Sequence, residues 1–166
     1  FDVLGKKTWR LGDRPVHAGI AKIAGNMMIT QAIQSLAEAS LLTEQYGLSP
    51  SAFIEVVTQT LFACPSYQRY GQNIVDDRYE PGFKLSLGLK DVNLALQAAE
   101  GRGLSLPVAR VVRSRMEAAV ASGLGNKDWS AFFNHGPTLS GVCADSRAMA
   151  HEPSKDFPPR ALLDHR

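Results

Sequence analysis

Apolar residues recur at intervals of three and four from about residue 18 to residue 46, the spacing of one face of an α-helix. The positions in register are Ile20, Ile23, Met27, Ile33, Leu36 and Leu41. Interspersed alanines favour a helix, and Gly47 can end it. A helix of this length extends about 40 Å, so we expect it to be the central and largely buried element. Gly25 within it costs up to about 1 kcal/mol relative to alanine, which indicates close approach of another helix or of a ligand.

Further stretches carry helix-start signals. Ser49 followed by Pro50 provides an N-cap and a first-turn proline, and Pro65 and Pro107 occupy equivalent positions. Asp128 is placed as the N-cap of a last, short helix. The predicted helices after the long one are residues 50–61, 65–74, 83–101, 107–121 and 129–134.

The fold class predicted from this pattern is all-α, with about six helices around one long central helix. Residues 7–11 predict a short strand. A lone strand is not stable in water, so we interpret residues 1–15 as the remnant strand and linker of a sheet whose other strands lie upstream. Residues 16–136 form the helical domain. The proline-rich remainder, 137–166, is expected to be an extended or partly disordered tail.

Composition narrows the class of protein further. The 166 residues are 45% hydrophobic and 20% charged, which is ordinary for one globular domain. The net charge of +2 argues against a nucleic-acid partner. No apolar run approaches a membrane span and no signal peptide is visible, so we expect a cytoplasmic protein. Cys64 and Cys143 are expected to be buried free thiols, and neither they nor the histidines have metal-ligand spacing.

Lys22 and Asn26 are the first candidates for chemistry. They are four residues apart and therefore project from one face of the long helix. One interpretation is a surface face with a solvated lysine. The alternative is that the positive N-terminal end of the helix helps Lys22 to bind a substrate carboxylate and lowers its pKa toward general acid–base use.

Lys90 and Asp91 are the second candidates. From their spacing alone, an exposed charge pair on a helix is the better interpretation. Dinucleotide-binding motifs are missing from the chain: Gly123-Leu124-Gly125 follows no strand and lacks the third glycine.

Several short motifs, taken in order from Leu4 to Phe133, resemble the β-hydroxyacid dehydrogenase family, which includes 3-hydroxyisobutyrate dehydrogenase. They resemble its C-terminal helical domain, of the kind also found in 6-phosphogluconate dehydrogenase. The motifs are Leu4-Gly5-Lys6-Lys7, Leu11-Gly12, Gly19-x-x-Lys22-x-x-x-Asn26, Leu36-Ala37-Glu38-Ala39, Tyr46-Gly47-Leu48-Ser49-Pro50, Pro81-Gly82-Phe83, Leu89-Lys90-Asp91, Leu106-Pro107 and Asp128-Trp129-Ser130-Ala131.

The resemblance implies a role for each candidate residue. Lys22 matches the catalytic lysine, which exchanges a proton with the substrate hydroxyl. Asn26 matches a residue that hydrogen-bonds and orients the substrate, and Asp91 supports the same site. Lys90 matches a residue near the cofactor, and Phe83 lines the site.

The resemblance also implies the partners of the chain. The cofactor is NAD or NADP, the substrate is a small hydroxyacid or semialdehyde, and the helical domain supplies a homodimer interface. The Rossmann domain of the family is missing, so the chain is expected to be inactive alone. The alternatives are a non-catalytic helical assembly module and, more remotely, an unrelated all-α ligand or nucleic-acid binder. The chain departs from the family at Val16-His17-Ala18, where glycines are usual, and at Gly25, where a second asparagine is common.

Overall fold

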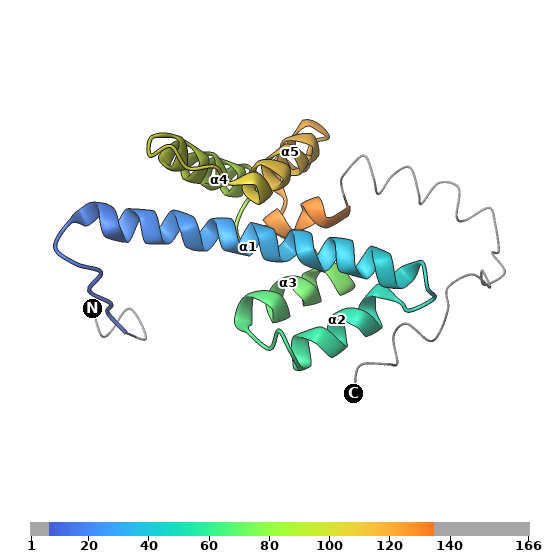
Figure 1. The fold of residues 1–166 in the computed structure, drawn as a ribbon. Helices are drawn as coiled ribbons and strands as arrows, with labels where there is room; N and C mark the ends of the chain where they lie inside the picture. Colours follow the sequence, from blue (N-terminus) through green and yellow to red (C-terminus); the bar gives the residue numbers. More distant parts are fainter. Residues whose placement is uncertain (1–6, 135–166) are drawn as a thin grey trace.

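The long helix α1 (Pro15–Glu44) runs through a computed structural model of the chain, which describes residues 7–134 (Figure 1). Pro15 occupies the first turn, where its missing N–H costs nothing, and the helix therefore starts earlier than expected. At the other end Gly47 takes a left-handed φ of +84°, and its N–H bonds to the Glu44 carbonyl at 3.0 Å. The glycine that was predicted to end the helix does so.

The two halves of α1 differ in environment. All its buried residues lie in the back half, 30–44, and they are Thr30, Ile33, Gln34, Leu36, Ala37 and Ser40. No residue of the front half, 15–29, is buried, and Val16 and Ile20 are 56% and 44% exposed. The expectation of a largely buried helix is therefore wrong for the front half, which the rest of residues 7–134 covers only in part.

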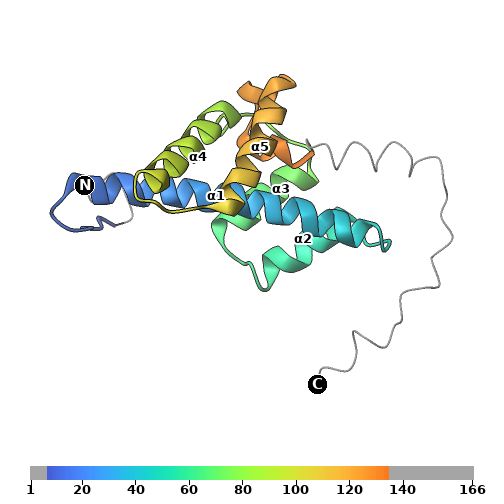
Figure 2. The same cartoon turned by 45° about the horizontal axis from the view of Figure 1, so that its top comes forward.

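Two helix pairs lie on opposite sides of α1 (Figures 1 and 2). One pair is α2 (Pro50–Gln59) and α3 (Pro65–Val75). The other pair is α4 (Leu85–Glu100) and α5 (Pro107–Ala121). Each of the four contacts α1, and the members of each pair contact one another. Within the described residues the fold is thus helical, with five α-helices, and the predicted helices agree with them within a few residues at each end.

The sixth predicted helix, 129–134, is a 3₁₀-helix, η2 (Trp129–Asn134), which follows another short one, η1 (Leu124–Asn126). Trp129 and Phe132 of η2 are buried, and η2 packs against α1, α3, α4 and α5. Its tight turns are stabilised by this burial rather than by length, because 3₁₀ geometry is poor in long runs.

Two sequence-based expectations are wrong. Residues 7–12 have no regular structure, so the predicted strand at 7–11 does not form; no strand lies beside it among residues 7–134. Cys64 is exposed at the N-cap of α3 rather than buried. Residues 1–6, the predicted tail at 137–166 and Cys143 lie outside the described residues. Within residues 7–134, no helix combines the length and hydrophobicity of a membrane span.

Two helical glycines have opposite surroundings. A Cβ added to Gly71 on α3 would lie 2.7 Å from the Ile54 Cγ2 of α2, so the lack of a side chain allows these helices to meet. A Cβ added to Gly25 would have no neighbour within 4 Å. The close approach of another helix that was expected at Gly25 is therefore not found within the described chain.

We predict that Gly71→Ala destabilises the chain by about 1–3 kcal/mol, because the buried Ile54 cannot move aside. Gly25→Ala is the matched control and should stabilise the chain by about 0.5–1 kcal/mol, since only helix propensity changes. Urea unfolding of both variants measures the two free energies. Equal effects of the two substitutions would contradict the assigned α2–α3 contact.

Candidate functional site

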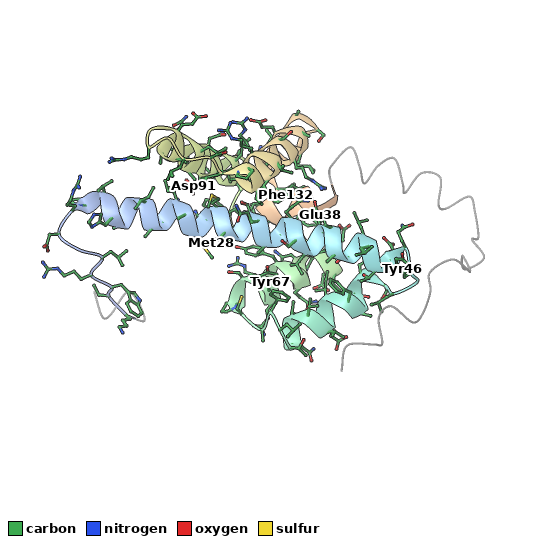
Figure 3. All side chains as sticks on the ribbon, viewed as in Figure 1. Met28, Glu38, Tyr46, Tyr67, Asp91 and Phe132 are labelled. Atoms are coloured by element: carbon green, nitrogen blue, oxygen red, sulfur yellow. The ribbon has the colours of Figure 1, made fainter. Side chains whose placement is uncertain are left out.

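A buried carboxylate, Asp91 of α4, joins the front half of α1 to α4. Its side chain is 1% exposed and lies between the two helices, whereas Met28 projects from the opposite side of α1 (Figure 3). The Lys22 ammonium group and the Asn26 side-chain amide both donate to Asp91 Oδ2, the amide at 2.6 Å. Lys22 and Asn26 therefore share a face of α1, as their spacing predicted, and that face is directed at α4.

Lys90 completes the charge cluster from the same helix as Asp91. Its Nζ is 3.4 Å from Asp91 Oδ1, an oxygen that accepts no hydrogen bond within the described residues. The Lys22 and Lys90 side chains are 55% and 61% exposed, so both ammonium groups reach solvent while the carboxylate does not. The structure thus brings Lys22, Asn26, Lys90 and Asp91 together, and leaves one excess positive charge at the accessible edge.

The pKa of Asp91 is set by two opposing effects. Burial alone would raise the pKa. Hydrogen bonds from Lys22 and Asn26, together with the charges of Lys22 and Lys90, outweigh it and hold the pKa below its usual value of 3.8. Asp91 is therefore ionised at neutral pH and forms an ion pair with Lys22.

Lys22 owes little to the helix dipole. It lies about two turns beyond Pro15, and the field of a helix end acts mainly within the first turn. The expectation that the positive end of α1 tunes Lys22 is therefore not supported by its place in the helix. Its ion-pair partner is Asp91, which comes from another helix.

Phe83, predicted to line the site, takes no part in the hydrogen bonds and ion pairs that join these four residues. It lies in the turn before α4, where its ring meets the edge of Trp129 at a centroid distance of 4.8 Å and an interplanar angle of 64°. Its position relative to the cluster depends on how this turn is held.

Sequence reasoning missed what holds the turn, which is the carboxylate of Asp128. Asp128 was expected only to cap η2, and it does accept from Ser130 N at 3.0 Å. It also accepts hydrogen bonds from the backbone N–H groups of Gly82 and Phe83. A fully buried aspartate needs such partners, but the sequence does not reveal a contact that spans more than forty residues.

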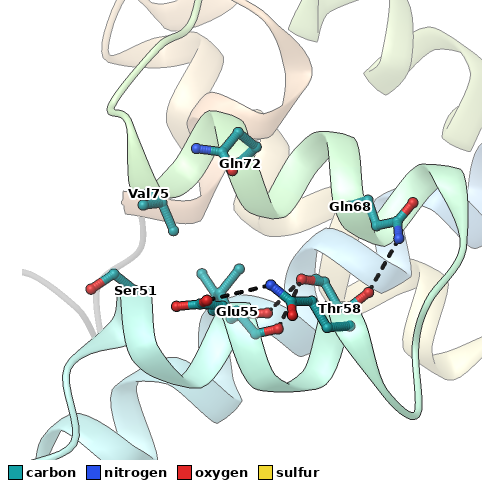
Figure 4. A pocket seen from close by; sticks show the side chains of 8 residues that line it. Ser51, Glu55, Thr58, Gln68, Gln72 and Val75 are labelled. Atoms are coloured by element: carbon teal, nitrogen blue, oxygen red, sulfur yellow. Dashed lines mark hydrogen bonds between the residues drawn. The ribbon is translucent and has the colours of Figure 1, made fainter.

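A separate groove of about 430 Å³ lies between α2 and α3 (Figure 4). It is lined by Ser51, Ile54, Glu55, Thr58, Gln59, Gln68, Gln72 and Val75. Its glutamine NH₂ groups are already used, since Gln68 donates to the Thr58 carbonyl at 3.3 Å and Gln59 donates to Glu55 at 3.4 Å. With one carboxylate and no basic residue in its lining, this groove does not suit an anionic substrate.

Comparison with known proteins gives a consistent result. Residues 17–135 match the sequence model described as the NAD-binding domain of NADP-dependent 3-hydroxyisobutyrate dehydrogenase. An uncharacterized oxidoreductase of Bacillus subtilis (strain 168), YfjR, is 39% identical over 79% of this chain and 46% of its own length. Glyoxylate/succinic semialdehyde reductase 2 of Arabidopsis thaliana is 34% identical over 79% and 36%. For 2-hydroxy-3-oxopropionate reductase of Escherichia coli (strain K12) the identity is 27%, over 79% and 44%.

Solved structures agree with these relatives. A 3-hydroxyisobutyrate dehydrogenase from Salmonella typhimurium superposes with a TM-score of 0.73 at 25% identity, over 80% of this chain and 47% of that one. The Mycobacterium tuberculosis 3-hydroxyisobutyrate dehydrogenase with L-serine gives 0.60 at 26% identity, over 69% and 41%. The chain therefore spans less than half the length of each of these relatives.

We predict that the Asp91 anchor makes stability depend on pH in the acid range. Because the folded-state pKa is lowered, the stabilisation is present above the unfolded value of 3.8 and is lost as the pH falls through the lower folded value. Unfolding free energies measured between about pH 2 and 6 should fall toward acid less steeply in Asp91→Asn than in the unchanged chain. The control is Asp13→Asn, because the ion pair of Asp13 with Arg10 is exposed. Parallel curves for Asp91→Asn and the unchanged chain would contradict this role of Asp91.

Proposed function

The chain belongs to the NADP-dependent 3-hydroxyisobutyrate dehydrogenase family, and from that premise we propose that it is the helical substrate- and cofactor-binding part of an NAD(P)-dependent β-hydroxyacid oxidoreductase. The family match bears out both the resemblance seen in the motifs and the predicted cofactor, NAD or NADP, at the level of the family. The observation that carries the proposal is the cluster of Lys22, Asn26, Lys90 and Asp91. The 166 residues of the chain contain no glycine-rich dinucleotide fingerprint. The proposed reaction therefore requires a dinucleotide-binding domain in addition, and we expect these 166 residues alone to be inactive.

Lys22 is the proposed proton donor and acceptor. When bound, the nicotinamide supplies a hydride to a carbonyl carbon, or takes one from a carbinol carbon. Lys22 Nζ gives a proton to the carbonyl oxygen in the first direction and takes it back in the second. Its exposed ammonium group can reach a ligand at the edge of the cluster, while the ion pair with Asp91 holds it in place in the resting site.

The remaining residues of the site have proposed roles in binding and orienting the substrate and the cofactor. Asp91 holds Lys22 and Asn26 in register, which supports a role in organising the site rather than in direct substrate binding. Asn26 orients the substrate beside Lys22, Lys90 lies toward the cofactor, and Phe83 borders the site. The two ammonium groups and one carboxylate leave a net charge of about +1, which suits a small monoanion.

The proposed substrate is a small hydroxyacid or semialdehyde. The names of relatives point the same way, since they include glyoxylate/succinic semialdehyde reductase and 2-hydroxy-3-oxopropionate reductase. Each of these compounds pairs a carboxylate with a reactive carbonyl. Such a compound is the kind of ligand that an ammonium pair beside a proton donor can accept.

The exposed front half of α1 supports a second element of the proposal. Val16 and Ile20 are apolar and exposed in the turns of α1 before Lys22, and we propose that the dinucleotide-binding domain covers them. A homodimer in the cytoplasm remains part of this proposal. A non-catalytic assembly module is the alternative candidate, favoured by the same exposed apolar residues, and it predicts that the charge of Lys22 is dispensable.

The test is made in the protein that joins this chain to its dinucleotide-binding domain. We expect Lys22→Met to lower kcat for reduction of succinic semialdehyde by about 10²–10⁴-fold, because the proton donor is lost. Lys22→Arg should keep substrate binding but not kcat, since a guanidinium does not release its proton. The absorbance of the reduced nicotinamide measures kcat and KM for both variants.

Lys84→Met is the matched control, because this lysine lies at the N-cap of α4 and bonds to Asn126 outside the cluster. It should leave kcat unchanged. Activity of Lys22→Met equal to that of Lys84→Met would contradict the proposed role and favour the assembly module.

A further inference from the structure

Asp128 fastens the turn that precedes α4. Its side chain is fully buried, and both carboxylate oxygens are used. Oδ2 accepts from the backbone N–H groups of Gly82 at 3.1 Å and Phe83 at 3.2 Å. Oδ1 accepts from the N–H and the hydroxyl of Ser130, at 3.0 and 2.6 Å. One carboxylate thereby ties the turn to η2.

Backbone hydrogen bonds also connect the turn before α4 to the segment before η2. Lys84 and Asp128 form an antiparallel bridge. On one side of it the Leu85 N–H donates to the Lys127 carbonyl, and on the other the Trp129 N–H donates to the Phe83 carbonyl, both at 2.9 Å. The first residue of α4, Leu85, is thus hydrogen-bonded to the segment that joins η1 to η2. We use the name Asp128 clasp for the Asp128 carboxylate together with the Gly82 and Phe83 N–H groups that donate to it.

We propose that Asp128 is a positioning residue of the candidate site, acting through Phe83 and the first turn of α4; this inference rests on the proposed function. The clasp holds the start of the helix whose next turn carries Lys90 and Asp91. It also sets the Phe83 ring against Trp129, which is itself 2% exposed. The placement of the Phe83 ring and that of the helix carrying Lys90 and Asp91 therefore both depend on the Asp128 carboxylate.

The physical reason is the free-energy cost of leaving the N–H groups of Gly82 and Phe83 without an acceptor. Charge-assisted hydrogen bonds to a carboxylate are stronger than neutral ones, and buried N–H groups that lose their acceptor must find another. Without the carboxylate the turn at Gly82 and Phe83 has to move to regain partners. A displacement on the order of 1 Å can cost about 10²-fold in rate in a positioned site, and the same movement weakens the hydrogen bonds that bind a ligand.

The experiment uses the 166-residue chain, ¹⁵N-labelled, with Asp128→Asn as the test variant and Ser130→Ala as the matched control. Asparagine keeps the volume but places an NH₂ group where two oxygens accepted hydrogen bonds. Ser130→Ala removes the hydroxyl that donates to Asp128 and accepts from the Asn73 amide, and it leaves the bonds from Gly82 and Phe83 to Asp128 in place. Titration with 3-hydroxyisobutyrate measures Kd, and the Asn26 side-chain amide reports the contact with Asp91 without ligand.

We expect Asp128→Asn to raise Kd by about 10-fold or more, to shift the Gly82 and Phe83 amide resonances and to move that of Asn26. Ser130→Ala should change Kd by less than about twofold. A folded Asp128→Asn chain with an unchanged Kd would overturn the proposal.

Failure of the proposed function gives a different result. If the unchanged chain does not bind 3-hydroxyisobutyrate, the ligand assignment fails, and the Asn26 resonance alone decides on the clasp. A change in the chemical shift of the Asn26 amide in Asp128→Asn, but not in Ser130→Ala, supports the positioning role of Asp128. An unchanged shift in Asp128→Asn overturns that role. If Asp128→Asn unfolds, Asp128→Ser, which retains a hydroxyl acceptor for η2, replaces it; unfolding of both variants means that the residue serves stability alone and overturns the proposal.

Discussion

The contact between Lys22 and Asp91 determines how the candidate site of this molecule is organised. A carboxylate that is 1% exposed cannot remain ionised without partners, and Lys22 and Asn26 supply them from the facing helix. The crossing of α1 and α4 is thus fixed at this point by polar contacts. Because both ammonium groups on Asp91 stay half exposed, the same contact that joins the helices also presents charge to a ligand.

The back half of α1 provides the rigid frame for this arrangement. Ile33 and Leu36 are buried together with Phe132 of η2, whose short helix touches four of the five α-helices. A close-packed core of this kind resists small displacements. Within residues 7–134 the front half reaches this core only through Met27 and Ile29, and its Lys22 and Asn26 are bound by Asp91 of α4. One helix thus has a buried back half that packs in the core and an exposed front half that carries Lys22 and Asn26. The exposed half leaves room for another domain to dock.

The sequence predicted local features well because their causes are local. Proline at the first helical turn and glycine in a left-handed conformation act within a few residues, so Pro107 and Gly47 placed a helix start and a helix end. The shared face of Lys22 and Asn26 follows from helical periodicity alone. The convergence of Lys90 and Asp91 on that face does not, because it depends on the crossing of α1 and α4; spacing favoured an exposed pair, and only the family resemblance pointed to the site. The buried role of Asp128 and the 3₁₀ geometry of η2 are likewise products of tertiary packing.

The redundancy of the contacts on Asp91 bears on how a lysine held by a carboxylate could act as a proton donor. If Lys22 were the sole partner, turning toward a substrate would strand a buried negative charge, at a cost of several kcal/mol. Asp91 Oδ2 also accepts from Asn26 at 2.6 Å, and Oδ1 lies 3.4 Å from the Lys90 ammonium group. Both remain when Lys22 moves, so the carboxylate keeps a neutral donor and a compensating charge. On the proposed function, Asn26 and Lys90 therefore matter for the release of Lys22 as well as for the ligand, and neither role can be separated from the buried position of Asp91.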